Sequence, residues 1–299
     1  MNPGRRSLSN PIASLVMVVI TVLWTIPTFG LAATSVRPAQ AVATTGWWTI
    51  FIHPQITFAN YHTVLFQSSV GSSAGLVPYL VNSLSITIPA TVMPVVLAAM
   101  AAYVLAWVRF KGSDTIFFVI FALQVVPIQM SLIPLLQLFS GGAHLGGVTL
   151  VPALGLGGTY FPVWAAHTMF AMPLAIFLLH NFMAQLPRDV MEAAQVDGAN
   201  HFKIFRSVVL PLSAPALASL AIFQFLWVWN DLLVALTFAG GTPAVAPLTV
   251  RLAQLAGSFG RNWELVTAGA FVSIVIPLIV FFALQRYFVR GLLAGSVKG

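Results

Sequence analysis

The chain consists of long apolar runs joined by short polar connections. Six runs are long enough to cross a hydrocarbon core, which takes about 20 helical residues. They cover residues 11–33, 78–107, 115–139, 159–184, 214–239 and 263–286. None of them alternates apolar and polar residues over about 10 positions, as membrane-spanning strands do. The pattern predicts an all-α membrane protein with six transmembrane helices.

Proline interrupts several of these runs. Pro89 and Pro94 lie in the second run, and Pro127 lies in the third. A proline removes one helical hydrogen bond, but neighbouring helices can satisfy the freed carbonyl within a membrane. We therefore expect a kink or a tilt in the second span and continuous helices elsewhere.

The connections suggest how the chain is divided. Residues 1–75 hold the first span and a polar external segment, residues 76–286 the other five spans, and residues 287–299 a tail. The Gly-rich stretch after the third span predicts a short interfacial or re-entrant element. A short helix from Leu248 to Leu255 is expected before the last span.

Composition supports the membrane assignment. Only 6% of the 299 residues are charged and 59% are hydrophobic, whereas an ordinary soluble domain is about one quarter charged. The chain has no cysteine, which excludes disulfides, thiolate catalysis and Cys-ligated metals. The net charge of +7 comes from dispersed residues with no basic stripe, so nucleic acid is not an expected partner. Membrane lipid is.

The basic residues predict the orientation, because Lys and Arg accumulate on the cytoplasmic side of membrane proteins. A cytoplasmic N-terminus leaves only Arg37, Arg251 and Arg261 outside, and puts the other ten of the 13 basic residues inside. Both termini are therefore predicted to be cytoplasmic. Residues 11–33 also resemble a cleaved signal in their charged start, but their apolar run exceeds the usual length of about 7 to 15 residues. A retained first span is favoured.

Residues 186–211 form a polar loop on the predicted cytoplasmic side. Pro187 and Asp189 predict the start of one short helix, with Met191, Ala194 and Val196 as its apolar side, and Asp197 with Gly198 predict its end. Asn200 can cap a second helix that runs until Pro211 intervenes. Exposed carboxylates favour a docking surface for a soluble partner over a helix pair that lies on lipid.

The loop resembles the EAA loop of permease subunits from binding-protein-dependent ABC importers. The matching positions are Glu192, Ala193, Ala194, Gly198, Leu210 and Pro211. The likeness runs from about residue 57 to the end and is closest to the carbohydrate branch, of the maltose and α-glucoside type. It also includes the segments FANYHTVL, FQFLWVWNDLLVAL and VRGLLAGSVKG.

The resemblance implies a type-1 ABC importer permease in a bacterial inner membrane, moving an α-glucoside or another oligosaccharide. Its implied partners are a second permease subunit, two ATPase subunits that use ATP and Mg, and an extracytoplasmic sugar-binding protein. The chain itself is expected to bind no cofactor, and ATP hydrolysis is expected on the separate ATPase. The coupling residues would be those of the EAA pattern together with Asp197. An outer loop at about 241–262 would touch the binding protein, with Arg251, Gln254 and Ser258 as candidates.

Polar residues within the spans offer a second candidate site. Asp231 lies beside Trp227, Trp229 and Asn230, and a buried carboxylate in a span is costly enough to suggest function. Aromatic faces and polar partners suit a sugar, but the favoured explanation is that Asn230 and Asp231 bond to adjacent helices and shape the helix bundle. Gln124, Gln129 and Asn181 are expected to bond between helices.

No catalytic or metal site is expected. His167 and His180 have no carboxylate at metal-ligand spacing, and no nucleophile, base and orienting group occur together. An ion-coupled secondary transporter is the main alternative, since such proteins use intramembrane acids. Asp231 alone, without a detectable internal repeat, makes that alternative weak, and an intramembrane enzyme lacks the residues it needs.

Overall fold

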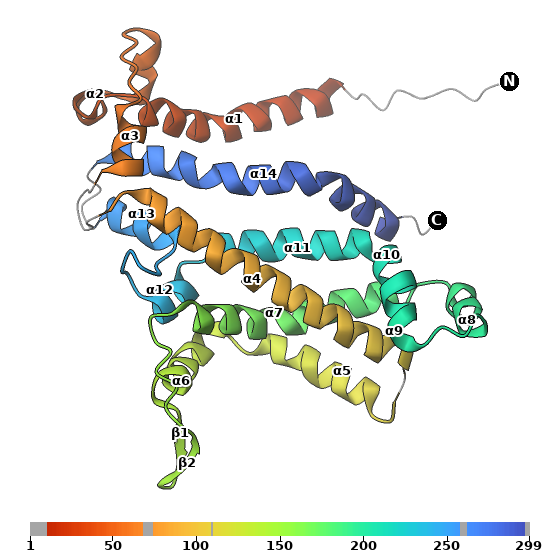
Figure 1. Cartoon of the computed structure of the whole chain (residues 1–299). Helices are drawn as coiled ribbons and strands as arrows, with labels where there is room; N and C mark the ends of the chain where they lie inside the picture. Colours follow the sequence, from red (N-terminus) through yellow and green to blue (C-terminus); the bar gives the residue numbers. More distant parts are fainter. Residues whose placement is uncertain (1–10, 68–73, 109, 258–261, 297–299) are drawn as a thin grey trace, which may run out of the picture. The chain divides into compact units, whose positions relative to one another are not determined.

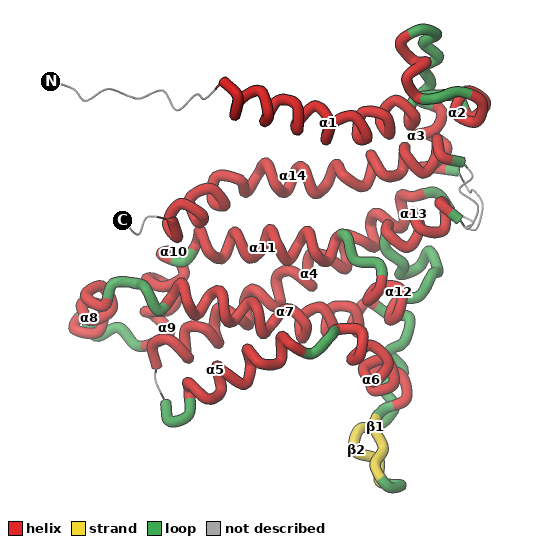
Figure 2. The backbone as a smooth tube through the Cα atoms, turned by 180° about the vertical axis from the view of Figure 1, so that it is seen from behind, coloured by secondary structure: helices red, strands yellow, loops and turns green. Residues whose placement is uncertain are grey.

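The computed structural model describes residues 11–67, 74–108, 110–257 and 262–296, with side chains as far as Gln285. The chain divides into two compact units. The first consists of residues 1–76 and 252–272, and the second of residues 77–251 and 273–299. Long helices dominate both (Figures 1 and 2).

The first unit contains helix α1 (Pro11–Ser35), the short helices α2 (Ala39–Thr44) and α3 (Ala59–Phe66), and a 3-10 turn at Trp47–Phe51. The Asn60 amide ties α3 to the end of α1, because it donates to the carbonyls of Ser35 at 2.9 Å and Arg37 at 2.8 Å. Buried Arg37 in turn donates to Gly46 O, Ala41 O and the Thr45 and Thr49 hydroxyls.

The second unit holds most of α4 and the helices α5 to α12. In chain order these are α4 (Leu76–Tyr103) with a π-helical turn at Val104–Val108, α5 (Ser113–Ala122) with a 3-10 turn at Leu123–Val125, α6 (Ile128–Gly141), α7 (Tyr160–Met183), α8 (Arg188–Val196), α9 (His201–Ile204) with a π-helical turn at Phe205–Val209, α10 (Leu210–Leu212), α11 (Ala214–Trp229) and α12 (Leu233–Ala239). Helices α13 (Leu248–Ala256) and α14 (Trp263–Ser296) contribute residues to both units.

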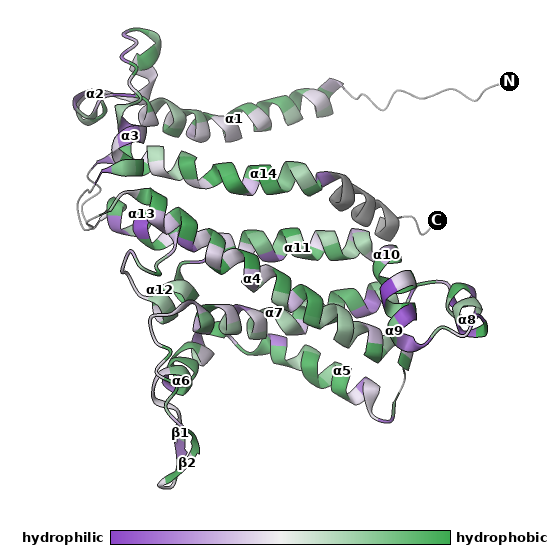
Figure 3. Cartoon of the chain, in the orientation of Figure 1, coloured by the Kyte–Doolittle hydropathy of each residue, from purple (hydrophilic) through white to green (hydrophobic). Residues whose placement is uncertain are grey.

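Helix α7 is the centre of the second unit. It contacts α5, α6, α11 and α12, and Figure 3 shows that α4, α5, α7 and α11 are mostly hydrophobic. Two buried clusters lie along it. One contains Leu179 and Met183 with residues of α4, α8 and α9, and the other contains Val163 and Ala166 with residues of α4, α6, α11 and α12.

The helices confirm an all-α membrane fold apart from one small hairpin. Four described helical segments are long and apolar enough to cross a membrane: Pro11–Ser35, Leu76–Val108, Tyr160–Met183 and Trp263–Gln285. Two bent pairs raise the number to as many as six. The predicted count of six is therefore the upper limit that these helices allow, and the orientation of the termini stays a prediction.

The third predicted span is not continuous. Its two halves, Ser113–Val125 and Ile128–Gly141, meet at 99°. Val126 and Pro127 between them both have extended backbone, with ψ of 119° and 128°, because a proline disfavours helical geometry in the residue before it. The expectation of a helix unbroken at Pro127 was wrong.

Two further segments show detail that the sequence did not predict. The Gly-rich stretch after α6 contains an antiparallel hairpin of β1 (Ala143–Leu145) and β2 (Val148–Val151), because positive φ angles at Gly146 and Gly147 allow a tight turn. The fifth predicted span ends its first helix at Trp229 and starts again at Leu233. The predicted helix at 248–255 is confirmed as α13.

Candidate functional site

The predicted docking loop folds into the two short helices that its sequence indicates. Helix α8 follows Pro187, whose φ of −59° suits a helix start, and Asp189 lies in its first turn. The helix ends at Val196, with Asp197 as its C-cap, because Gly198 adopts a φ of +76°, a conformation that glycine reaches without steric cost. The Gly198 N–H then donates to Gln195 O at 2.9 Å.

The second short helix begins as predicted and ends later than predicted. The Asn200 side chain accepts a hydrogen bond from the Lys203 N–H at 2.9 Å and caps α9. The chain continues helically through the π turn and past Pro211 as far as Leu212. Proline is tolerated there because it lies in the first turn of α10. The segments His201–Leu212 and Ala214–Trp229 meet at 74°.

Helix α8 has one buried side. Met191 is 3% exposed and packs in a cluster with Leu179 and Met183 of α7, and Ala194 is partly buried against the same cluster. Val196, predicted on this side, is 88% exposed. It follows Met191 by five residues, which turns it by about 140° around the helix, so it points to the opposite side.

The other side of the loop carries the charges. Glu192, Ala193, Asp197 and Gly198 are exposed, and within the part of the chain that the structure describes the Glu192 carboxylate makes no ion pair or hydrogen bond. Figure 3 shows hydrophilic residues gathered on α8 and α9. Leu210 is partly buried against the cluster of Met191, and Pro211 is exposed. We call the exposed set Glu192, Ala193, Asp197 and Gly198 the α8 surface.

The sequence did not reveal two polar contacts near this loop. One joins α9 to α4, and the other joins the π-helical turn after α4 to the end of α7. The Tyr103 hydroxyl lies 3.0 Å from His201 Nδ1, and its ring lies 5.2 Å from that of Phe205. The Trp107 indole donates to Met183 O at 2.9 Å. Tyr103 directly precedes the π-helical turn at Val104–Val108, and Trp107 lies within it. Such turns are often found at functional sites.

The four candidate residues of the fifth span lie in different environments. Trp229 is 4% exposed, stacks on Phe225 and donates its indole N–H to Ser273 O at 3.1 Å. Asn230 is exposed and donates to Leu226 O at 2.7 Å. Trp227 lines a cavity between α7 and α11, and the other three residues do not line it.

Asp231 holds the start of α12 through hydrogen bonds to its backbone. Its carboxylate accepts from the N–H groups of Val234 at 3.3 Å and Ala235 at 2.8 Å, and so caps α12 where the span restarts. His167 Nε2 lies 3.6 Å from the same carboxylate, and the fully buried His167 ring meets Trp227 edge-on at 5.3 Å. Among the described residues no group of three metal-ligating side chains occurs.

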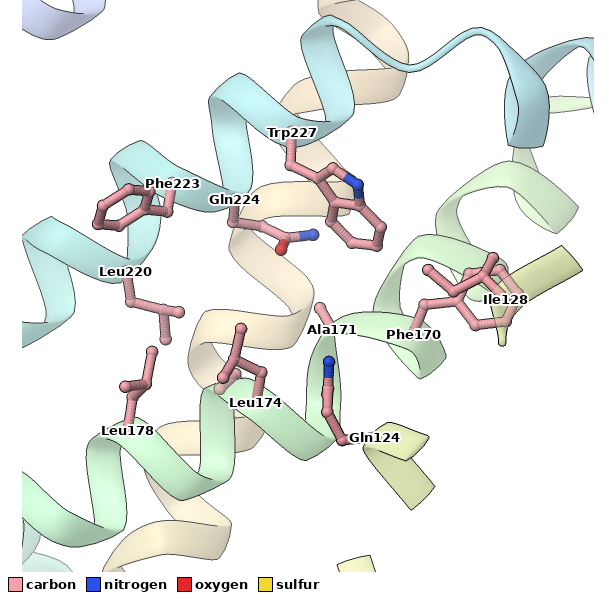
Figure 4. Close-up of a pocket in the computed structure, with 11 residues that line it drawn as sticks. Gln124, Ile128, Phe170, Ala171, Leu174, Leu178, Leu220, Phe223, Gln224 and Trp227 are labelled. Atoms are coloured by element: carbon pink, nitrogen blue, oxygen red, sulfur yellow. The ribbon is translucent and has the colours of Figure 1, made fainter. Parts of the chain in front are cut away.

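The cavity lies between α7 and α11, beside the break between α5 and α6, and has a volume of about 510 Å³ (Figure 4). Helix α11 contributes Gln224 and Trp227, and the broken third span contributes Gln124. The complete lining is Gln124, Ile128, Phe170, Ala171, Leu174, Ala175, Leu178, Leu220, Phe223, Gln224 and Trp227.

The outer-loop candidates occupy different environments. Arg251 is 1% exposed, with its guanidinium 5.9 Å from the Tyr79 ring. Burial lowers the pKa of the Arg251 guanidinium below its usual value, and Tyr79 offsets part of that change. Gln254 is partly buried, and Ser258 lies outside the described residues. A buried Arg251 offers no side chain for a partner to touch in this conformation.

The loop before α13 is fixed to the spans. The Asn82 amide donates to Pro243 O at 2.9 Å and to Ala246 O at 3.0 Å, and it accepts from the Tyr160 hydroxyl at 2.7 Å. Ser83 Oγ accepts from the Leu248 N–H at 2.8 Å. These contacts hold the start of α13 against α4 and α7.

Comparison with known proteins identifies the type of chain. It is 49% identical to the osmoprotective compounds uptake permease protein GgtD of Synechocystis sp., over 95% of this chain and 91% of the relative. It is 41% identical to the alpha-glucoside transport system permease protein AglG of Rhizobium meliloti, with all of both chains covered. A bacterial ABC transporter that imports the acidic polysaccharide alginate has the same fold, with a TM-score of 0.66 at 18% identity over 94% of this chain and 97% of that chain.

Residues 94–293 match the family described as binding-protein-dependent transport system inner membrane component. This match includes the loop at residues 186–211, the broken fifth span and the cavity, and it confirms the family that the EAA pattern indicates. The chain belongs to the binding-protein-dependent transport system inner membrane components.

Proposed function

We infer that this chain is the permease subunit of an ATP-driven importer for α-glucosides or closely related uncharged oligosaccharides. The permease forms half of the translocation pathway, and a second permease subunit forms the other half. An extracytoplasmic binding protein delivers the sugar, in line with the family description. The names of the two relatives support the substrate class, because a small neutral glucoside fits both an α-glucoside permease and an osmoprotectant permease.

The observation that carries the proposal is the two-sided geometry of α8. Its inner side, with Met191, packs in the cluster of the spans, while Glu192 on its outer side has no partner among the described residues. A helix with this arrangement can bind a soluble subunit through the α8 surface and pass a displacement to α7 through Met191. Mechanical coupling to a separate ATPase needs both properties.

The ATPase supplies the energy in this proposal. The chain has no phosphate-binding fingerprint in its sequence, so ATP and Mg belong to two partner ATPase subunits, and this chain has no hydrolytic role of its own. An ion-coupled transporter is disfavoured by the family match and by the capping role of Asp231, which occupies that carboxylate with the backbone of α12.

The test uses the complete importer in proteoliposomes, with both permeases, the ATPase and the binding protein. Wild type is expected to take up an α-glucoside from a panel of sugars only when the ATPase and ATP are present. Uptake that persists without the ATPase subunits would contradict an ABC mechanism.

Glu192→Lys tests the coupling role directly. It inverts an exposed charge on the α8 surface without touching the buried cluster, so we expect sugar-stimulated ATP hydrolysis to be lost while membrane insertion is kept. Asp114→Lys is the matched control, because Asp114 is an exposed acid in the first turn of another helix, α5. Unchanged stimulation in Glu192→Lys, or equal loss in both variants, would remove the role assigned to Glu192.

A further inference from the structure

The cavity between α7 and α11 combines two kinds of surface. Phe170, Phe223 and Trp227 bring aromatic rings, and the remaining apolar lining is aliphatic. The polar groups are the amides of Gln124 and Gln224. Figure 4 shows Gln224 entering from α11 and Gln124 from the turn after α5. No charged side chain lines the cavity.

The two amides differ in how they are held. Gln224 is 6% exposed, and its Nε2 donates to Ala90 O on α4 at 3.0 Å. This bond fixes the amide and leaves its oxygen as an acceptor. Gln124 is exposed, and its side chain makes no hydrogen bond among the described residues. Its amide retains both donors and an acceptor for a ligand.

The Trp227 ring is supported by His167, which lies outside the cavity lining. Its ring meets the edge of the buried His167 ring at 5.3 Å and 88°, and His167 lies 3.6 Å from the carboxylate that caps α12. The break in the fifth span therefore positions the aromatic wall of the cavity. His167 and Asp231 stand outside the lining and act on it only through Trp227.

This chemistry suits a neutral glycoside. The face of a sugar ring carries C–H groups that pack on aromatic side chains, while its hydroxyl groups donate to and accept from amides. A volume of about 510 Å³ falls within the usual range of about 300 to 1,000 Å³ for small-molecule sites. A cavity that bound only acyl chains would gain nothing from two amides, because an unpaired amide is costly beside hydrocarbon.

The absence of charge in the lining also fits transport. A site along a translocation path must bind its cargo strongly enough to admit it and weakly enough to release it. Two amides and three aromatic rings provide modest binding without an ion pair. A high-affinity receptor site would not meet the need for release, because it would hold the sugar too long.

We propose that the cavity between α7 and α11 is a low-affinity site for one or two glycosyl units of the transported sugar, with Gln124 as a hydrogen-bonding residue and Trp227 as the stacking platform. The proposal rests on the inferred function, namely that the cargo is a neutral glycoside. It adds that this chain contacts the sugar directly, at residues remote from the α8 surface.

Gln124→Leu tests the site. The change keeps the size of the side chain and removes an amide that has no partner among the described residues, so the fold is expected to remain intact. Gln129→Leu is the matched control, because Gln129 is also exposed and lies five residues further on, outside the lining. In proteoliposomes with the complete importer, Gln124→Leu is expected to reduce sugar uptake per ATP by about 2- to 12-fold, the range of one neutral hydrogen bond. Gln129→Leu is expected to match wild type both in sugar uptake and in binding-protein-stimulated ATP hydrolysis.

A cross-linking experiment identifies the occupant. Maltose that carries a diazirine is added to the complete importer during turnover, and the labelled peptides are mapped by mass spectrometry. Labelling of peptides from α7 or α11 that excess maltose suppresses supports the site. Labelling confined to the partner permease, or label recovered only on lipid, overturns it.

The outcomes separate this inference from the function on which it rests. If wild type transports a glucoside but the two glutamine variants behave alike, the site is wrong and the function stands. If the complete wild-type importer takes up no sugar of the panel, the function and the site both fail.

Discussion

Met191→Ala is expected to detach helix α8 from the spans. Met191 is 3% exposed in the cluster that contains Leu179 and Met183 of α7, and replacing such a buried side chain by alanine costs about 2 to 5 kcal/mol. Helix α8 has only nine residues, too few to be stable by itself in water. Most of the loss therefore falls on the docking of this helix. At about 1.4 kcal/mol for each tenfold change, its amides are expected to exchange hydrogen up to about 30- to 4,000-fold faster.

The measurement is hydrogen exchange of the purified permease pair, followed by mass spectrometry of peptides that cover residues 186–200. Val196→Ala is the control on the same helix, because Val196 is 88% exposed and exposed substitutions usually stay within about 0.5 kcal/mol. Faster exchange in α8 with Met191→Ala alone is expected. Equal effects of the two variants would refute the assignment of the buried side of α8.

Two further changes test the polar contacts of the second unit. Asp231→Ala is expected to cost about 0.5 to 2 kcal/mol in thermal unfolding, because it removes the cap of α12, whereas Asp231→Asn retains an acceptor and is expected to be close to wild type; equal damage by Asn would assign the stability to the charge beside His167 instead. Asn82→Ala leaves the carbonyls of Pro243 and Ala246 without their donor and is expected to cost about 1 to 3 kcal/mol, with faster proteolysis of residues 240–247. Proteolysis as slow as in wild type would show that Asn82 does not hold this loop.

Hydropathy predicted where the apolar helices lie because membrane length is a local property of the sequence. The runs at 11–33, 159–184 and 263–286 correspond closely to Pro11–Ser35, Tyr160–Met183 and Trp263–Gln285. Hydropathy does not show the direction in which the helix axis runs. Val125 and Val126 are as apolar as the helices on either side of them, so the bend of 99° leaves no trace in the average.

Proline gives a signal at that bend but an ambiguous one. The residue before a proline is displaced toward extended geometry, and Val126 follows the rule with a ψ of 119°. Yet Pro89, Pro94 and Pro173 lie inside unbroken helices. Packing of the surrounding helices decides between a kink and a break, and a single sequence does not contain that packing.

The candidate residues illustrate the same limit. Pro187, Asp189 and Gly198 predicted where α8 begins and ends because helix starts and stops are local, whereas its apolar side was predicted only in part, since Val196 is exposed. Asp231 carried a local signal too, since an aspartate before an apolar run is a typical N-cap, but its position within a span favoured a functional interpretation. The burial of Arg251 depends on Tyr79, which is far away in the sequence, and Gln224 was overlooked although it lies three residues from Trp227 on the same helical face.

Three helices, α4, α7 and α11, belong to both buried clusters and so link the proposed coupling role to the proposed sugar site. Helix α4 contributes Ala98 and Tyr103 to the cluster of Met191, and Ile86 and Ala90 to the cluster around the fifth-span break. Its 28 residues extend about 42 Å at 1.5 Å per residue. Close-packed helices transmit displacements because their interiors deform little. A shift of α8 that moves the end of α4 therefore also moves Ala90, whose carbonyl holds the amide of Gln224. In this mechanism the ATPase changes the shape of the sugar site through the same hydrogen bond that orients it.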